Sequence, residues 1–577
     1  MSPHKVDDVY EAPYKIERQL LFAPRKLRIV CIGAGASGMY MAIRQEQLLE
    51  NVEFQIYEKN PDVAGTWFEN KYPGAACDVP AHIYTFSFAP KTDWSHYYAE
   101  SDEIQEYFSS VADKYRVRRF IKFDHQLVSA EWNEQNAKYE LQIKTSNGSI
   151  LRDECDILVN ACGILNAWKW PAIPGLQDFQ GELLHSANFD RSWTPDGRNV
   201  ALIGTGSSAI QILPKIQPKA KHIDTYARSP TWIAMPFAGI KSRQPQGNPP
   251  YSDLEKEHFK NDPAYHLQYR CDLESEFNHY YEMFVDNCDL QLSTVRDLTA
   301  RMEASLAKKP ELIPLLIPKF GVGCRRLTPG VGYLEAMCED NVEVVTQEIT
   351  RVTADGVVSA DGTERKVDTI ICATGFDVSF TPRFNLTGKN GFKCDEKFGA
   401  DPKGYMSLAI RDLPNYFIFN GPQACAANGS FLPVLEATAD YILKCVHKIQ
   451  TQRIRTMNPK QEAIDDLVEH VDTLMPETVW VHSCRSWYKN NTVDGRVTAV
   501  WPGSTLHFLS VIKEPRWEDY DYEYLGGKNR FSYFGTGQTK TEAEGGERAA
   551  HLRTRVHLFD EWWPEHEKKL VESDATA

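Results

Sequence analysis

Two glycine-rich segments, GAGASG at 33–38 and GTGSSA at 204–209, constrain this chain more than any other feature. Each follows a short apolar run, 27–32 or 200–203, and each leads into a stretch that favours helix. In a Rossmann unit such glycines form the tight turn between strand and helix and let the backbone approach a pyrophosphate. The chain is therefore expected to bind two dinucleotides, through Gly33, Gly35 and Gly38 in the first segment and Gly204, Gly206, Ser207 and Ala209 in the second.

The residue that ends the second strand of each unit separates the two ligands. The apolar run 54–57 ends in Glu58, whose carboxylate can accept hydrogen bonds from an unphosphorylated ribose. The run 223–226 is followed by Arg228 and Ser229, and a guanidinium there can pair with a 2′-phosphate. The first site is thus predicted to bind FAD and the second NADPH. The alternative for Glu58 and Arg228 is a solvated charge at the end of a strand.

Length and charge limit the classes of function. At 577 residues the chain exceeds one compact core, so roughly two to four domains are expected. The net charge of −15 argues against nucleic acid or an anionic membrane as a partner. The N-terminal segment lacks the apolar region of a signal peptide, and no apolar stretch is long enough to cross a bilayer. These features predict a cytoplasmic enzyme; they do not indicate its oligomeric state.

Cysteine usage gives a separate expectation. The thirteen cysteines are scattered and form no CxxC pair. This pattern predicts reduced intracellular thiols, with no disulfide framework and no zinc or other metal site. Cys31, Cys162 and Cys372 fall in apolar, strand-like runs and are expected in the core.

The order of these patterns predicts an α/β fold with two Rossmann-like dinucleotide-binding domains, for FAD and NADPH, and a helical insertion in the NADPH domain. Buried-strand patterns at 155–163 and 368–377 close the two units, and the charged, helix-favouring sequence between them reads as a lid, a substrate wall or a stabilising cap. The expected boundaries are 1–25 for an N-terminal extension, 26–165 for the first part of the FAD domain, 175–237 for the first part of the NADPH domain, 238–320 for the insertion, 321–380 for the second part of the NADPH domain, and 385–577 for the second part of the FAD domain with C-terminal loops.

A signature follows the first nucleotide motif. The stretch 65–78, GTWFENKYPGAACD, resembles the GxWxxxxYPGxxxD signature of type I Baeyer–Villiger monooxygenases, position for position. The likeness covers the chain from about 27 to 510. In that family the two units bind FAD and NADPH, and a ketone becomes an ester or lactone with dioxygen, through a C4a-peroxyflavin. By this resemblance Gly65, Trp67, Tyr72 and Asp78 belong to the cofactor site.

A second signature lies between the two units. The stretch 179–190 is similar to the family pattern FxGxxxHxxxW followed by Pro or Asp, and supplies Phe179, Gly181 and His185. It departs from the pattern at Phe189, where the family usually has Trp. Related N- and S-oxygenating flavin monooxygenases carry Tyr or Phe there, followed by Lys, so Phe189 favours them, whereas Asp190 and the first signature favour ketone oxygenation. On this linker His185 is expected to be a structural histidine and not the general base.

The chemistry requires a fixed cation, because a flavin peroxide attacks a carbonyl only as its anion. The segment 320–328, FGVGCRRLT, supplies two adjacent arginines. By resemblance Arg326 is the catalytic arginine, Arg325 reaches the NADP phosphate, and Asp78 holds and tunes Arg326 across the two domains. The alternatives are a solvated basic pair for the arginines and a turn-capping role for Asp78.

Trp487 lies in Ser486–Lys489, which resembles the family's mobile segment whose Trp contacts the nicotinamide nucleotide. The run 490–495, NNTVDG, lacks the family's usual Asn-x-Pro-Gly-Lys, so a packed indole remains the alternative for Trp487, as packed core aromatics do for Trp67 and Tyr72.

Three other functions compete with ketone oxygenation. One is oxygenation of nitrogen or sulfur, and another is a flavin disulfide reductase, which needs a cysteine pair that Cys77 lacks in the sequence. The third is a non-catalytic nucleotide-bound redox sensor. The expected partners are a small ketone and dioxygen, and no motif identifies the ketone.

Overall fold

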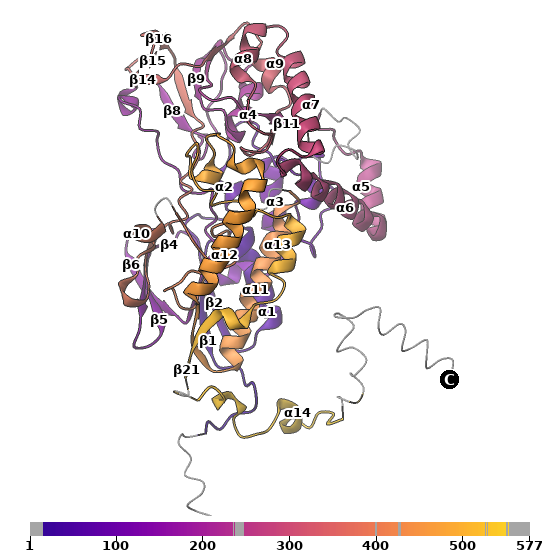
Figure 1. Ribbon diagram of the computed structural model, residues 1–577, viewed down its shortest axis with the longest axis vertical. Helices are drawn as coiled ribbons and strands as arrows, with labels where there is room; N and C mark the ends of the chain where they lie inside the picture. Colours follow the sequence, from indigo (N-terminus) through magenta and orange to yellow (C-terminus); the bar gives the residue numbers. More distant parts are fainter. Residues whose placement is uncertain are drawn as a thin grey trace, which may run out of the picture. The chain divides into compact units, whose positions relative to one another are not determined.

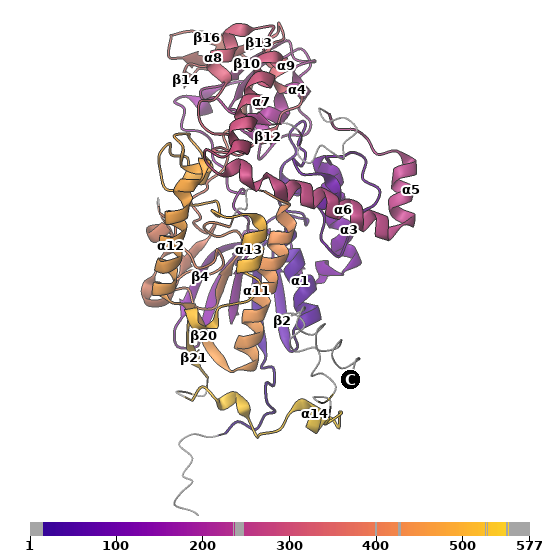
Figure 2. The ribbon, with the colours of Figure 1, turned by 45° about the vertical axis from the view of Figure 1, so that its right-hand side comes forward.

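The computed structural model describes residues 16–234, 236, 247–398, 401–424, 428–525, 527, 529–549 and 552. The chain divides into two compact units. The larger comprises Leu27–Val446 and Met457–Asp521 and contains the two parallel sheets drawn in Figures 1 and 2. The smaller comprises Met1–Lys26, His447–Thr456 and Tyr522–Ala577, and its described residues include helix α14 (Lys540–Ala543).

The first sheet has five strands in the order β19-β7-β1-β2-β3. They are β1 (Leu27–Ile32), β2 (Val52–Tyr57), β3 (Ile121–Lys122), β7 (Ile157–Asn160) and β19 (Tyr416–Ile418), all paired in parallel. The strands β1 and β7 are almost completely buried, as expected for a parallel sheet covered on both faces. β19 pairs with β7 although more than 250 residues separate them, so the C-terminal part of the chain returns to complete the first nucleotide unit.

A four-stranded sheet branches from this unit, in the order β18-β4-β5-β6. Its strands are β4 (Gln126–Asn133), β5 (Lys138–Lys144), β6 (Ile150–Cys155) and β18 (Asn385–Thr387). β4, β5 and β6 form an antiparallel meander, and alternate side chains of β5 are buried. Its buried face packs into one hydrophobic cluster with Val30, Ile32 and Leu158 of the first sheet.

The second parallel sheet has the order β13-β10-β9-β17-β8. Its strands are β8 (Glu182–His185), β9 (Asn199–Ile203), β10 (His222–Tyr226), β13 (Val342–Val345) and β17 (Thr369–Cys372). The two five-stranded parallel sheets, each with a glycine turn at the end of a central strand, confirm the prediction of two Rossmann-like domains in an α/β fold. A small antiparallel sheet, β14 (Ile349–Val352), β15 (Gly356–Ser359) and β16 (Glu364–Lys366), connects β13 to β17.

Helices occupy most of the described chain between β11 (Ile233–Ala234) and β12 (Thr328–Pro329). They are α5 (Asp253–Asn261), α6 (Pro263–Asn278), α7 (Asp289–Ser305) and α8 (Ile313–Leu316). Figure 2 shows α6 running from the lobe of the second sheet toward α3 and α5. Its His266 side chain contacts His82, so part of this segment packs on the first nucleotide unit. Residues 235 and 237–246, which include the start of the segment expected as the insertion, lie outside the described residues.

The remaining helices and strands complete the fold. They are α1 (Ala36–Leu48), α2 (Thr66–Glu69), α3 (Ser101–Lys114), α4 (Ser207–Ile216), β11 (Ile233–Ala234), β12 (Thr328–Pro329), α9 (Tyr333–Met337), α10 (Cys394–Phe398), α11 (Phe431–Thr451), β20 (Ile454–Pro459), α12 (Gln461–Leu474), α13 (Thr505–Val511) and β21 (Tyr520–Tyr524). None of the helices within the described ranges is long and apolar enough to cross a membrane.

Candidate active site

A cavity of about 730 Å³ opens at the carboxyl ends of the first-sheet strands. Its walls include Gly33, Gly35 and Glu58 from the nucleotide motif, Gly65 and Trp67 from the signature that follows, and Trp168 from the crossover to the second sheet. This volume lies within the range of about 300–1,000 Å³ usual for ligand sites. The residues predicted to hold one dinucleotide therefore surround one cavity.

Glycine is required at the turn for a steric reason. Gly33 has a φ of +106°, and a Cβ there would lie 2.7 Å from the carbonyl oxygen of Ala161 on the neighbouring strand. A Cβ on Gly38 would lie 2.0 Å from the carbonyl oxygen of Gly33, and one on Gly65 would lie 3.1 Å from Cα of Gly35. These residues leave a space that a side chain would fill, which suits close approach of a pyrophosphate.

Glu58 is 4 % exposed at the end of β2. Its carboxylate accepts hydrogen bonds from the backbone N–H groups of Ala34, at 2.7 Å, and Asn60, at 2.8 Å. Burial raises the pKa of Glu58, and these two hydrogen bonds oppose the rise. Because a carboxylate can accept about four hydrogen bonds, two positions remain for ribose hydroxyls.

The two aromatic residues of the signature take different positions. Trp67 lines the cavity and donates a hydrogen bond from Nε1 to the Tyr84 hydroxyl, at 3.0 Å. Tyr72 instead points toward the second nucleotide unit, where its hydroxyl donates to Oε1 of Gln211, at 2.7 Å. Burial raises the pKa of Tyr72, so its phenol stays protonated as the donor.

Gln211, on α4, links the signature to the second unit. Its Nε2 donates to the carbonyl of Ala76, at 2.9 Å. A Cβ on Gly74 would lie 2.6 Å from the backbone carbonyl oxygen of Gln211, so the signature packs closely on α4 here. The sequence analysis missed this residue. The available signal was a polar side chain between Ile210 and Ile212 in the first turns after the second glycine motif.

The two residues predicted to be catalytic meet. Arg326 donates a hydrogen bond from Nη2 to Oδ2 of Asp78, at 2.6 Å. The Asp78 side chain is 18 % exposed and that of Arg326 is 41 % exposed. Both charges act on the Tyr84 phenol, which lines the cavity. The pair therefore lies beside the wall of the first nucleotide cavity, and the Arg326 side chain is partly open to solvent.

The second glycine turn has the same geometry as the first. Gly204 has a φ of +126°, and a Cβ there would lie 2.4 Å from the Ala373 carbonyl oxygen. A Cβ on Gly206 would meet nothing within 4 Å, so this side of the turn is open. Ala209 is fully buried in α4, and Ser207 at its first residue bonds the Thr328 hydroxyl at 2.6 Å.

Arg228 lies in the loop after β10, and Arg325 reaches the same loop from the segment 320–328. The Arg228 side chain is 62 % exposed and lies 4.0 Å from Glu348, an exposed ion pair worth little. Arg325 donates from Nη1 to the carbonyl of Pro230, at 2.9 Å, and therefore reaches the loop that contains Arg228 and Ser229. Burial lowers the pKa of the Arg325 guanidinium, and within the described residues no carboxylate acts on it. A phosphate would supply the missing anion.

His185 lies inside the linker. It is fully buried on β8, its ring stacks on Trp168 with centroids 4.5 Å apart, and its Nε2 lies 3.3 Å from the Thr374 hydroxyl. Burial lowers its pKa to about 4, so the ring is neutral near pH 7. His185 thus connects the two segments that cross between the sheets as a fully buried histidine.

The rest of the linker signature packs around this strand. The Phe179 ring packs directly on Gly181. A Cβ on Gly181 would lie only 2.5 Å from Cζ of Phe179. Phe189 is buried, and Trp193 packs its ring edgewise on it with centroids 5.6 Å apart. The Trp193 indole N–H also donates to the Thr369 hydroxyl of β17, at 3.2 Å. An indole is therefore present next to Phe189, four residues later in the chain.

One cysteine expectation is wrong. Cys324 and Cys484 form a disulfide, although the sequence analysis predicts free thiols. The two cysteines are 160 residues apart, and only the tertiary fold brings their Cα atoms to 6.5 Å. The bond connects the segment of Arg325 and Arg326 to the loop of Trp487. The Trp487 ring is partly buried and lies 4.6 Å from that of Tyr488.

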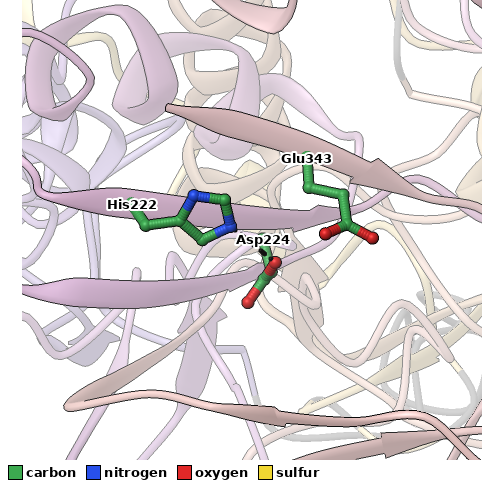
Figure 3. Close-up of side chains that lie close together, drawn as sticks. All are labelled: His222, Asp224 and Glu343. Carbon is green, nitrogen blue, oxygen red and sulfur yellow. Dashed lines mark hydrogen bonds and ion pairs between the residues drawn. The ribbon is translucent and has the colours of Figure 1, made fainter. Parts of the chain in front are cut away.

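Among the described residues, one group of side chains comes within the mutual reach of metal ligands: His222 and Asp224 on β10 and Glu343 on β13 (Figure 3). His222 Nε2 lies 3.1 Å from Asp224. The Arg365 guanidinium already lies here, with Nε 3.1 Å from Glu343 and 3.7 Å from Asp224. Since that cation balances the carboxylates, we interpret the group as an ion-pair network and assign no metal to it.

Comparisons with known proteins agree with a flavin monooxygenase fold. The family of flavin-binding monooxygenase-like proteins matches residues 26–240. The FAD-binding monooxygenase tazF of Aspergillus terreus is 40 % identical over 528 residues, which are 91 % of this chain and 94 % of the relative. A Baeyer-Villiger monooxygenase of Pseudomonas aeruginosa is 31 % identical over 85 % of this chain and 90 % of its own. In fold, the chain is similar to NADP+-bound cyclohexanone monooxygenase from Rhodococcus sp. Phi1, with a TM-score of 0.74, 24 % identity, and coverage of 87 % of this chain and 100 % of that one.

Proposed function

Since this chain belongs to the flavin-binding monooxygenase family, we propose that it inserts one oxygen atom of O2 beside a ketone carbonyl, giving an ester or lactone, with FAD and NADPH as cofactors. The observation that carries this proposal is the Arg326–Asp78 hydrogen bond. It joins the segment 321–328 of the second nucleotide unit to the signature 65–78 of the first nucleotide unit. A fixed cation beside the flavin cavity is what attack on a carbonyl requires.

The first cavity fits FAD. The turn at Gly33 and the contact of Gly35 with Gly65 leave room for a pyrophosphate, and Glu58 offers free acceptor positions for a ribose. FAD bound here would supply the reaction with dioxygen, with the electrons taken from NADPH. In this proposal Trp67 is a wall of that site, and Tyr72 holds the signature against α4.

The second unit fits NADPH. Gly204, Gly206 and the start of α4 form the pyrophosphate turn, where the helix N-terminus favours an anion. Arg228 and Arg325 both reach the loop after β10, which is where a 2′-phosphate would bind. Arg325, on which no carboxylate of the described residues acts, and Arg228, whose ion pair with Glu348 is exposed, favour the phosphorylated nucleotide over NADH.

The reaction assigns separate roles to three side chains. Arg326 would stabilise the negative charge that develops on the oxygen attacking the carbonyl and then on the carbonyl oxygen. Asp78 would orient the guanidinium through the 2.6 Å hydrogen bond. His185 is neutral and has its ring nitrogens occupied by Thr374 and the backbone of Ala187, so it would act as a structural support and not transfer a proton.

The closest alternative is oxygenation of nitrogen or sulfur, which Phe189 favours. Trp193 supplies an indole against Phe189, and this reduces the weight of that departure from the ketone signature. A disulfide reductase is disfavoured because Cys77 is a free, buried thiol whose pKa burial raises, so it is a poor nucleophile. The Arg326–Asp78 contact argues against a sensor without turnover, which would have no need of it.

A substrate panel tests the proposal. Purified enzyme with FAD and NADPH is offered linear, cyclic, aromatic and polycyclic ketones beside amines and sulfides, and products are identified by mass. Esters or lactones from at least one ketone class are expected. Turnover of amines or sulfides with no ketone product would establish the alternative, and NADPH binding with no product at all would favour the sensor.

A further inference from the structure

The segment that bears Arg325 and Arg326 is tied to the loop that bears Trp487 by a covalent bond. Cys324 precedes the two arginines, and Cys484 lies three residues before Trp487. Both cysteines are buried, at 0 % and 2 % exposed. Because thiol–disulfide exchange needs access to a sulfur atom, small thiols cannot reach this bond in the folded protein.

His482 forms a second tie two residues from the disulfide. Its Nδ1 accepts a hydrogen bond from the Gly321 backbone N–H, at 3.0 Å, so the ring proton is on Nε2. That nitrogen lies 3.1 Å from Oδ1 of Asp286, to which it donates. A Cβ on Gly321 would lie 2.9 Å from Nδ1, so a side chain at this position would force the His482 ring to shift.

The segment is also held from the side of α7. The Gln291 side chain donates from Nε2 to the carbonyl of Val322, at 2.8 Å, and accepts from its N–H, at 3.3 Å. Gly321, Val322 and Cys324 are therefore all held immediately before the arginines. Arg326 itself keeps an exposed side chain, so the ties act on the backbone that carries it.

The Trp487 loop is a compact structure of its own. Lys489 is 1 % exposed, and its Nζ donates to the carbonyls of His482, at 2.6 Å, and Val493, at 2.5 Å. The Ser486 N–H donates to the carbonyl of Thr492, at 3.3 Å. These hydrogen bonds tie residue 482 to residues 489 and 493 and residue 486 to residue 492, so the backbone around Trp487 is held to the backbone around Cys484.

We propose that Cys324, Cys484 and His482 form a clamp that makes the arginine segment 321–326 and the loop 482–493 one positioning unit. The three are positioning residues, which act through Arg326 and Trp487. The clamp couples binding of the nicotinamide nucleotide to the placement of Arg326. Its effect on catalysis rests on the proposed function, whereas its existence does not.

Peptide mapping tests the bond directly. The unmodified protein is unfolded without reductant, labelled with N-ethylmaleimide, digested and analysed by mass spectrometry. The peptides containing Cys324 and Cys484 should be found linked and unlabelled, and they should separate only after a dithiol reductant converts the disulfide to two thiols. Labelling of both cysteines before reduction overturns the proposal.

Cys484→Ala and Cys324→Ala then test the coupling, with Cys271→Ala, an exposed free thiol on α6, as the matched control. Trypsin cleavage after the exposed Arg485 should become about tenfold faster in the two clamp variants and stay unchanged in the control. The KM for NADPH should rise about fivefold with little change in kcat, and more NADPH should be consumed per product formed. An unchanged KM and an unchanged ratio of NADPH to product, with the linked peptide present in the parent, overturn the positioning role.

His482 provides a second, independent variant. His482→Asn keeps an acceptor for the Gly321 N–H, so its KM for NADPH should stay close to the parental value. His482→Ala should raise the KM for NADPH as Cys484→Ala does. Equal effects of both substitutions would contradict the hydrogen-bond part of the clamp. If no substrate supports product formation, the proposed function fails, yet the mapping and proteolysis still decide whether the clamp exists.

Discussion

Arg326 donates its hydrogen bond to Asp78 from a position 248 residues later in the chain, and this contact joins the two nucleotide units beside the cavity at the first sheet. Asp78 and Arg326 lie on segments that are far apart in the sequence, so only the packing of the two nucleotide units brings them together. The docking of Tyr72 and Gly74 on Gln211 of α4 brings the same two units together.

Replacing Arg326 by Ala should abolish most product formation while FAD binding and flavin reduction by NADPH persist. Loss of one preorganised donor typically costs about 2.7–4 kcal/mol of barrier, roughly a hundredfold to a thousandfold in rate. Asp78→Ala should have a milder effect, because Asp78 only orients the guanidinium. Anaerobic stopped-flow absorbance measures reduction, and product and hydrogen peroxide are measured under air.

The control for this experiment is Arg198→Ala, which removes an arginine paired with Glu182 at the surface of the second sheet. It should leave the rate of product formation unchanged. An Arg326→Ala enzyme that makes product at close to the parental rate would show that the guanidinium is structural.

Arg228→Ala should weaken NADPH binding and leave NADH binding nearly unchanged. A charge-assisted contact to phosphate is worth roughly 1.5–3 kcal/mol, which corresponds to about a tenfold to hundredfold loss. Titration of both nucleotides with the parent, with Arg228→Ala and with the exposed Arg351→Ala as control measures this preference. Equal losses for NADPH and NADH would assign Arg228 a purely structural role.

Phe189→Trp should keep the class of product, because Trp193 already places an indole against residue 189. A Trp at 189 adds volume at a buried position and should lower the melting temperature modestly. Product identification by mass and thermal unfolding check the two parts. A change from ester to N-oxide or sulfoxide products would mean that this position selects the chemistry.

Stability should fall as the pH is lowered from about 6.5 toward 4. The folded state lowers the pKa of His185 and of His266 to about 4, in both cases by burial, from the usual value of 6.5. Between these values the unfolded chain binds more protons than the folded chain, so the free energy of unfolding decreases with falling pH. Melting temperatures across this interval should show the decrease.

The variant His266→Gln removes one of these groups and should flatten the dependence of the melting temperature on pH. His266 contacts His82, whose pKa burial also lowers, so part of the dependence remains. His470→Gln, on the exposed face of α12, should leave the curve as in the parent. Parallel curves for all three proteins would contradict the assignment.

The local patterns of the sequence were sufficient for the two Rossmann units. The glycine turns, the apolar runs around 27–32 and 200–203 and the later buried strands carry their own steric and hydrophobic signals, and the second sheet is completed by β17 as those signals predict. Glu58 was expected from its position at the end of the second strand, and the Arg326–Asp78 pair from the resemblance to the family signatures. The structure brings the two members of the pair within hydrogen-bond distance.

Tertiary structure alone decided those contacts between distant segments that no motif marks. Gln211 in α4, the His482–Gly321 hydrogen bond and the Cys324–Cys484 bond have no spacing rule, since their partners are more than a hundred residues away. The position of Trp193 against Phe189 likewise depends on how the chain after β8 folds back on β17. Local sequence determines which turns and strands form, and packing of the units determines which side chains meet, because only burial brings remote groups within hydrogen-bonding or covalent reach.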